Sequence, residues 1–141
     1  MPPTLEELFE GSTPLARKLA REGPYSSQHA LIDRARVLVD ALTEEEKIAT
    51  LNAHPRIGED PHRMSVRSRA EQGQEDALPE LARLNAEYED RFGFRFVVFV
   101  NRRPKSEIAA VLRQRLNRTR AEELEAGLRA IVDIAEDRSR G

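Results

Sequence analysis

The sequence predicts an all-α fold, a single compact domain of about seven or eight helices over residues 1–141. Apolar residues recur at helical spacing along most of the chain, and Ser or Thr residues that can cap a helix precede several of these segments. Only one stretch, FRFVVFV at residues 94–100, is rich in residues that favour β-strands, and it has no evident partner strand. A chain of 141 residues can bury about two-thirds of its unfolded surface.

The first half of the chain contains signals for four helices. Each signal is a capping residue followed by apolar residues at helical spacing, and the candidate caps are Thr4, Ser12 or Thr13, Ser26 or Ser27, and Thr43. Gly11 and the Gly23–Pro24 pair are expected to end the first two helices. Thr43 forms a capping box with Glu46, and the helix that follows must end at His54, because Pro55 disfavours α geometry in the residue before it.

The second half begins with an irregular region and then returns to helices. Residues 55–77 contain several prolines and glycines and few apolar residues, so loop and short helical turns are expected there. Further helices are predicted from Leu78 to about Phe92, from Ser106 to Leu116, and from a capping box at Thr119 and Glu122 to about Arg138. Residues 94–100 are expected to be a lone extended segment packed among these helices rather than part of a sheet.

His54 stands at a forced helix end, which allows two interpretations. It is either an ordinary boundary residue or an imidazole held rigidly at the edge of a cleft. Glu71 is also open to two interpretations, as the capping-box partner of Ser68 in a short helical piece or as a carboxylate that folds back toward His54. In the second case the carboxylate would fix the tautomer of His54 and raise its pKa, and the pair would be a general acid or base.

Other kinds of catalytic site have weaker support in the sequence. The chain has no cysteine, which excludes disulfides, thiolate nucleophiles and cysteine-based zinc sites. It also has no nucleophilic-serine motif and no glycine-rich phosphate or dinucleotide loop. The competing possibility is a metal site made by His54, Glu59, Asp60 and His62. These residues lack the helical histidine pair of a zinc protease, and carboxylates in a loop interrupted by proline are usually solvated, so a metal site is not expected.

The charge balance argues against nucleic acid or a membrane as the partner. The formal net charge is −2, with 23 Lys and Arg against 25 Asp and Glu. The basic cluster of Arg113, Arg115, Arg118 and Arg120 is interpreted as a solvated turn between two helices, because no aromatic residues are interleaved with it. No apolar run approaches the roughly 18 residues of a membrane span, and the first residues are acidic where a secretory signal would be basic. We therefore expect a cytoplasmic protein with a small-molecule partner.

Four sequence blocks follow one another along the chain. They are LNAHPRIG at residues 51–58, SRAEQ at 68–72, LNAEYEDRFGFRFVVFV at 84–100, and a helical tail from Arg115–Leu116 to Arg138. Together they resemble the OHCU decarboxylase family of urate catabolism, whose substrate is 2-oxo-4-hydroxy-4-carboxy-5-ureidoimidazoline (OHCU). The resemblance covers nearly the whole chain. It implies an all-α, homodimeric carboxy-lyase that uses neither metal nor organic cofactor and releases CO2 to leave S-allantoin.

The resemblance also implies roles for particular residues. His54 corresponds to the proposed proton donor, and Glu71 is its expected catalytic partner. The further residues expected to contact the substrate are Pro55, Ser68, Gln72, Phe96, Val97, Val98, Phe99 and Val100. The last five are expected to bind through backbone groups, because a partnerless extended segment leaves its N–H and C=O groups free.

A second function stays open, that of a helical binding module on the same fold, either non-catalytic or with altered specificity. Three departures from the common family pattern bear on this choice. Arg56 follows the His54–Pro55 pair, Arg95 stands where proline is common, and Glu75–Asp76 lies where an Ala–Gly pair is usual. The pairing of His54 with Glu71 favours the enzyme, whereas the altered 75–76 region favours the binding module.

Overall fold

The computed structural model describes residues 3–57 and 79–140, and within these ranges the chain forms seven α-helices and no β-strand. The helices are α1 (Leu5–Phe9), α2 (Pro14–Glu22), α3 (Gln28–Ala41), α4 (Glu44–Asn52), α6 (Pro79–Phe92), α7 (Lys105–Arg115) and α8 (Arg120–Ser139). Residues 95–100 run between α6 and α7 without regular secondary structure or a paired strand. The predicted all-α class and the lone extended segment are both confirmed.

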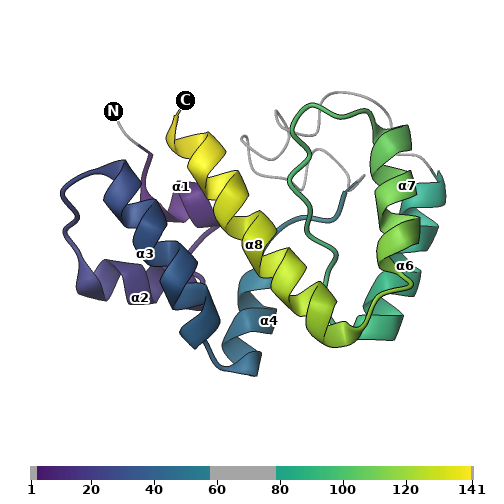
Figure 1. Cartoon of the computed structure of the whole chain (residues 1–141), viewed down its shortest axis with the longest axis horizontal. Helices are drawn as coiled ribbons and strands as arrows, with labels where there is room; N and C mark the ends of the chain where they lie inside the picture. Colours follow the sequence, from purple (N-terminus) through teal and green to yellow (C-terminus); the bar gives the residue numbers. More distant parts are fainter. Residues whose placement is uncertain (1–2, 58–78, 141) are drawn as a thin grey trace.

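Helix α8 runs through the middle of the molecule and organises the packing of the other elements (Figure 1). Helices α1, α3 and α4 pack against α8, and α2 contacts these three helices rather than α6 or α7. Helices α6 and α7 pack against each other on the opposite side of α8. The extended segment passes between this pair and α8, and Arg95 at its start is hydrogen-bonded to Asn52 and His54 at the end of α4.

Side-chain caps determine most of the helix starts. The side chains that accept a hydrogen bond from a backbone N–H of the first turn are those of Thr4, Thr13, Ser27, Thr43 and Thr119. Thr43 and Thr119 form the predicted capping boxes with Glu46 and Glu122. Helix α7 differs slightly from the prediction, because it begins at Lys105 after Pro104, which supplies no side-chain cap.

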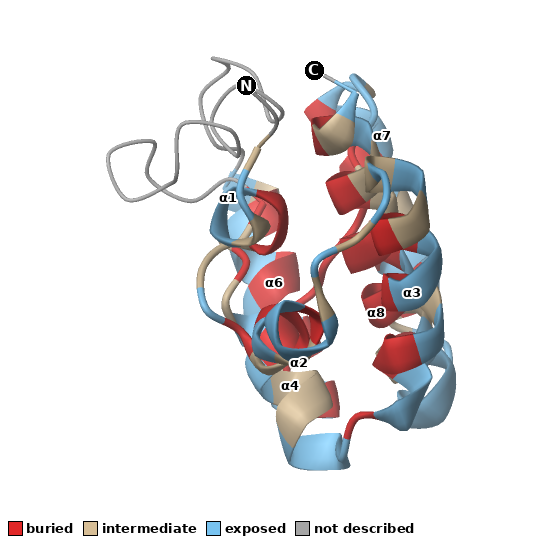
Figure 2. Cartoon of the chain, turned by 90° about the vertical axis from the view of Figure 1, so that its left-hand side faces the viewer, coloured by how far each residue is buried: buried red, intermediate tan, exposed pale blue. Residues whose placement is uncertain are grey.

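The inward faces of the helices carry the apolar residues, as Figure 2 shows for α3 and α8. Helices α8 and α4 approach each other closely at Gly127 and Leu51, near the end of α4. A Cβ added at Gly127 of α8 would lie 2.7 Å from Cδ2 of Leu51, which is fully buried on α4. No side chain therefore fits at residue 127 without moving Leu51. Helix α4 ends at Asn52, two residues before His54, so this contact also sets the position of His54.

The basic cluster at the α7–α8 turn is solvated as predicted at Arg113, Arg118 and Arg120, whereas Arg115 is buried. Arg115 is 9% exposed, and its Nε donates across 2.7 Å to Oε1 of the fully buried Glu123. The hydroxyl of Tyr88 donates to the same oxygen across 2.7 Å. The other cluster members also meet carboxylates, in the pairs Arg113–Glu80, Arg118–Glu123 and Arg120–Glu44. The prediction was wrong for Arg115 alone, because Arg115 pairs with Glu123, and a paired charge can be buried where an isolated one cannot.

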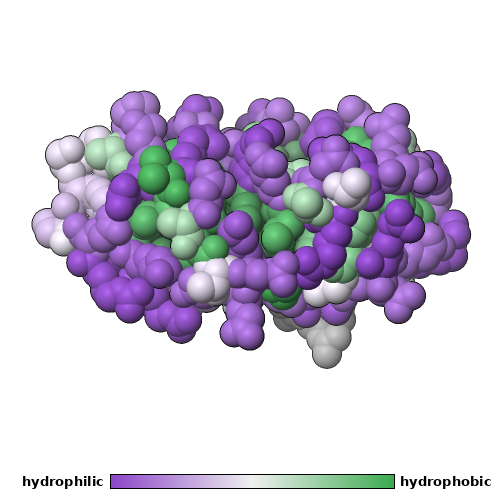
Figure 3. Space-filling view, turned by 60° about the horizontal axis from the view of Figure 1, so that its bottom comes forward, coloured by the Kyte–Doolittle hydropathy of each residue, from purple (hydrophilic) through white to green (hydrophobic). Residues whose placement is uncertain are grey.

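Hydrophilic side chains cover most of the face shown in Figure 3, with apolar atoms visible between them. Across residues 3–57 and 79–140, Val37 is the single large apolar side chain that is exposed. No helix within these ranges has the length and apolar character needed to cross a membrane.

Candidate active site

His54 lies just beyond the C-terminal end of α4, where the chain turns away from the helix. The backbone N–H of His54 donates to the Leu51 carbonyl oxygen across 3.1 Å, so the last turn tightens instead of extending. Pro55 then has no N–H with which to continue the helix. The imidazole of His54 is 3% exposed and lines a cavity of about 320 Å³. The predicted helix end therefore holds a buried imidazole at the edge of a cavity.

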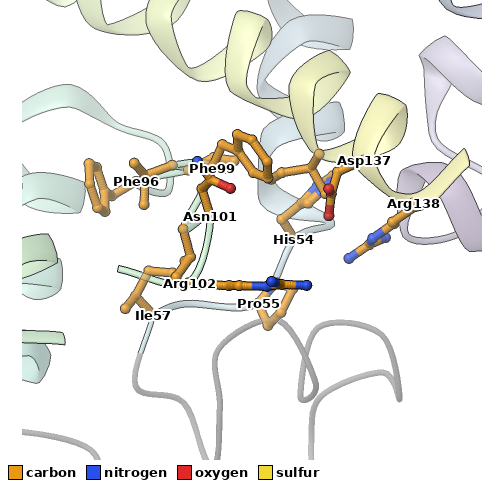
Figure 4. A pocket seen from close by; sticks show the side chains of 13 residues that line it. His54, Pro55, Ile57, Phe96, Phe99, Asn101, Arg102, Asp137 and Arg138 are labelled. Carbon is orange, nitrogen blue, oxygen red and sulfur yellow. The ribbon is translucent and has the colours of Figure 1, made fainter. Parts of the chain in front are cut away.

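Three parts of the described chain line this cavity (Figure 4). They are the loop after α4 with His54, Pro55 and Ile57, the extended segment and following turn at residues 96–102, and the end of α8 with Ile134, Asp137 and Arg138. The structure therefore brings His54, Pro55 and the five residues Phe96 to Val100 to one site. The other residues singled out in the sequence lie outside the described residues: Glu59, Asp60, His62, Ser68, Glu71, Gln72, Glu75 and Asp76.

Several lining residues have no counterpart among the sequence predictions, namely Ile57, Asn101, Arg102, Ile134, Asp137 and Arg138. Residues 101–102 form a turn between the extended segment and α7, and residues 134–138 lie near the end of α8, which the sequence predicted to run to about Arg138. Neither pattern indicates a cavity. The approach of these residues to His54 depends on how α8 and the extended segment pack beside α4, which local spacing does not encode.

The surroundings of His54 lower its pKa from the ordinary 6.5 to about 4. Burial is the largest cause, because it removes water from the charged form, and the Arg138 guanidinium adds repulsion. The Glu10 carboxylate and a weaker contact with the Thr50 backbone act in the opposite direction. Neither ring nitrogen forms a hydrogen bond of good geometry with any described residue. His54 is therefore neutral at pH 7. The rise in pKa expected from the sequence depended on Glu71, which lies outside the described residues.

A buried ion pair joins α8 to α1 beside the cavity. Nη2 of Arg138 donates to Oε1 of Glu10 across 2.7 Å, and Nη1 donates to the Glu7 carbonyl oxygen across 2.9 Å. Glu10 caps the end of α1 with a left-handed φ of 61°. The Glu10 carboxylate offsets part of the positive charge that Arg138 brings to His54, which is why the two residues shift the pKa of His54 in opposite directions.

Arg56 and Arg95, two of the departures noted in the sequence, brace the loop that carries His54 and do not line the cavity. Nη1 of Arg95 donates to the His54 carbonyl oxygen across 3.1 Å, and the Arg95 backbone N–H donates to Oδ1 of Asn52 across 2.9 Å. Arg56 binds the Glu89 carboxylate of α6 in two places, from Nε across 2.6 Å and from Nη2 across 3.0 Å. Both arginines therefore hold the loop in position.

The extended segment presents unoccupied backbone donors. Among the residues that the structure describes, none accepts a hydrogen bond from the N–H groups of residues 96–100. Three carbonyl groups of the segment are occupied, since Nη1 of Arg115 donates to Val97 across 3.2 Å and Arg103 donates to Phe99 and Val100. The N–H groups have no acceptor among the described residues, so their availability to a substrate stays a prediction, whereas the expectation of free carbonyl groups was wrong for Val97, Phe99 and Val100.

The donor set of the cavity suits proton transfer on a small polar molecule. It combines a neutral imidazole, unoccupied backbone N–H groups, two guanidinium groups and the Asp137 carboxylate. Within residues 3–57 and 79–140, no group of three or more His, Cys, Asp or Glu side chains could hold a metal ion.

The family model of OHCU decarboxylase matches residues 3–140. The chain belongs to the OHCU decarboxylase family. This is a family of carboxy-lyases of urate degradation, in agreement with the four sequence blocks and the all-α fold. A 2-oxo-4-hydroxy-4-carboxy-5-ureidoimidazoline decarboxylase of Haloferax volcanii is 32% identical over 137 residues, which cover 92% of this chain and 81% of that relative.

Longer relatives carry a similar segment within a larger protein. The uric acid degradation bifunctional protein PucL of Bacillus subtilis is 32% identical over 138 residues, and that of Bacillus sp. (strain TB-90) is 29% identical over 137 residues. The matches cover 94% and 91% of this chain but only 28% and 27% of those relatives. The chain therefore spans about a quarter of the length of these two bifunctional relatives.

Solved structures support the same family and fold. An OHCU decarboxylase crystallised in the presence of (S)-allantoin aligns with a TM-score of 0.76 and 26% identity, over 91% of this chain and 89% of that one. An (S)-allantoin synthase aligns with a TM-score of 0.71 and 23% identity, over 97% of this chain and 47% of that one, and this second likeness supports the fold alone.

Proposed function

We propose that this OHCU decarboxylase converts OHCU to S-allantoin without a cofactor, with His54 as the proton donor. One observation carries the proposal: a buried, neutral imidazole lines the same cavity as a segment with unoccupied N–H donors. Family membership supports the choice of substrate, because the relative from Haloferax volcanii is named as the decarboxylase of that compound.

The substrate itself can accept the electrons that decarboxylation releases. In OHCU, C4 carries the hydroxyl and carboxylate groups, and C5 carries the ureido group and is doubly bonded to ring nitrogen N1. When the bond from C4 to the carboxylate breaks, CO2 leaves and the electron pair forms a C4=C5 double bond. The C5=N1 π pair moves to N1, which takes up a proton. The ring C=N bond is thus the electron sink that an organic cofactor supplies in other decarboxylases.

A second proton transfer completes the reaction. The enol formed by loss of CO2 becomes allantoin when C5 gains a proton and the C4 hydroxyl loses one. Neutral His54 suits this exchange, because at pH 7 one ring nitrogen accepts a proton while the other carries one. His54 accepts the hydroxyl proton and delivers a proton to one face of C5, which sets the S configuration. A positioned acid–base group of this kind contributes about 10²- to 10⁴-fold to the rate.

The remaining predicted residues bind and orient the substrate in this proposal. Glu71 orients His54 or the C4 hydroxyl, while Pro55, Ser68 and Gln72 contact the ring. The N–H groups of residues 96–100 donate to the ureido oxygen and to the C2 carbonyl oxygen of the ring, which shares the negative charge that develops on N1.

Circular dichroism of the product tests the proposed function. Freshly generated OHCU is mixed with the purified protein, and the dichroic signal of S-allantoin is followed over time. Spontaneous decarboxylation gives a racemic product, so any net signal reports on the protein. We expect a signal of the S enantiomer whose initial rate rises in proportion to protein concentration. A racemic product at every protein concentration would contradict the proposal and favour the helical binding module.

We also propose that residues 1–141 act as one domain and that two copies form a homodimer. Size-exclusion chromatography with light scattering tests the assembly. We expect the mass of two chains at micromolar concentration, and the mass of one chain would contradict the dimer.

A further inference from the structure

Two consecutive residues in the cavity wall have a backbone conformation that side chains disfavour. Asn101 and Arg102 have φ values of 48° and 63°, directly after the extended segment. Residues other than glycine are uncommon in this left-handed region, and they persist there where the surrounding structure or a function requires the side chain. Both residues line the cavity that contains His54. The conformation therefore places an arginine at the site at a cost in backbone energy.

The Arg102 side chain reaches across the cavity toward Pro55, as Figure 4 shows. Arg102 forms no ion pair with a carboxylate of the described residues, and its side chain is exposed. The second guanidinium of the cavity differs in this respect, because Arg138 is buried against Glu10 at 2.7 Å. Among the described residues that line the cavity, Asp137 is the single carboxylate. The guanidinium of Arg102 is therefore hydrated and planar, and its N–H donors can bind a ligand that enters the cavity.

We propose that Arg102 is a specificity residue that recognises the carboxylate of the substrate. A guanidinium binds a carboxylate through two parallel hydrogen bonds, a geometry that a neutral ligand does not match. This inference rests on the proposed function, in which OHCU carries a carboxylate and the product allantoin carries none. Arg102 therefore favours the substrate over the product, and loss of CO2 removes the contact that holds the ligand.

The role of Arg102 is in binding and not in the chemical step. An ion pair to the departing carboxylate is at least as strong before the reaction as in the transition state, so it cannot lower the barrier. Removing such a contact should raise KM and leave kcat nearly unchanged. This outcome separates Arg102 from His54, whose loss should act on kcat.

Two stable ligands test the assignment without turnover. Hydantoin-5-acetate carries a five-membered ring with a carboxylate, whereas (S)-allantoin is neutral, and isothermal titration calorimetry gives the Kd of each. We expect Arg102→Gln to weaken hydantoin-5-acetate about tenfold and to leave (S)-allantoin within about twofold. Arg102→Lys should give an intermediate result. Arg17→Gln, on the exposed face of α2, is the control of equal charge change and should alter neither Kd.

Arg102→Gly gives a second variant that the backbone accepts, because glycine tolerates a φ of 63° without strain. It should show the same selective loss of hydantoin-5-acetate binding as Arg102→Gln. Equal weakening of both ligands, or an unchanged Kd for hydantoin-5-acetate, would overturn the role of Arg102. A wild-type protein that binds hydantoin-5-acetate through Arg102 but yields racemic allantoin would instead overturn the proposed function, so the two failures are distinguishable.

Discussion

Arg95 donates a hydrogen bond from Nη1 to the carbonyl oxygen of His54 across 3.1 Å, which ties the start of the extended segment to the imidazole-bearing residue in the cavity wall. The Arg95 side chain thus joins the loop that carries His54 to the extended segment, the two parts that face the substrate in the proposed reaction. Arg95 itself does not line the cavity.

Replacing Arg95 by Met should lower kcat about tenfold, because a small displacement of a catalytic group costs a large factor in rate. Met keeps the length of the side chain but cannot donate to His54. The free energy of unfolding should fall by about 1 kcal/mol, the usual worth of one such hydrogen bond. Steady-state kinetics and urea unfolding measure the two effects. Arg17→Met is the control, and a kcat equal to that of the wild type would show that the brace does not position His54.

Acid should destabilise the protein through His54. Because its pKa is about 4 in the folded protein and near 6.5 in the unfolded chain, the unfolded chain binds more protons between these values. Stability is therefore highest above pH 6.5 and falls as the pH drops toward 4, by up to about 3 kcal/mol from this group. His54→Asn should lose stability less steeply over the same window. Urea unfolding at several pH values compares the two slopes, and equal slopes would mean that His54 titrates normally.

The buried ion pair of Arg115 and Glu123 should matter more for stability than any surface pair. Glu123→Gln leaves the Arg115 guanidinium buried with a neutral partner, so the free energy of unfolding should fall by about 3 kcal/mol. Tyr88→Phe removes only the hydroxyl bond to Glu123 and should cost about 1 kcal/mol. Arg129→Gln, in an exposed pair with Glu125, is the control and should change stability by less than about 1 kcal/mol. A Glu123→Gln variant as stable as the wild type would contradict a buried charge network.

Gly127→Ala should destabilise the protein although alanine favours helix. The helical preference of Ala over Gly contributes about 1 kcal/mol, whereas crowding Leu51 costs about 1–3 kcal/mol. Leu51→Ala removes the clashing methyl, so the double variant should be more stable than the sum of the two single effects. Thermal unfolding measures this coupling. Additive effects would mean that α4 moves freely away from α8.

The local features of the fold could be predicted from the sequence because their causes are local. Thr43 and Thr119 with Glu three residues later fix helix starts, and Pro55 ends a helix wherever the chain folds. The lone extended segment was also predicted, since β-favouring residues with no second strand leave few alternatives.

The parts that could not be predicted depend on contacts between distant residues. Glu10 and Arg138 stand at opposite ends of the chain, yet their ion pair sets part of the electrostatic field at His54. The lowered pKa of His54 follows mainly from burial, which a helix end in the sequence does not reveal. No pattern in the sequence marks Arg102 as a site residue, and only the folded chain places it in the cavity wall.

The most direct test of His54 is the rate and handedness of allantoin formed by His54→Asn. Asn keeps a polar side chain but cannot exchange a proton, so the folded variant should lose about 10²- to 10⁴-fold in kcat and yield nearly racemic allantoin by circular dichroism. Wild-type protein at the same concentration should yield the S enantiomer. A folded His54→Asn variant that still forms S-allantoin at the wild-type rate would contradict the assignment of His54 as the proton donor.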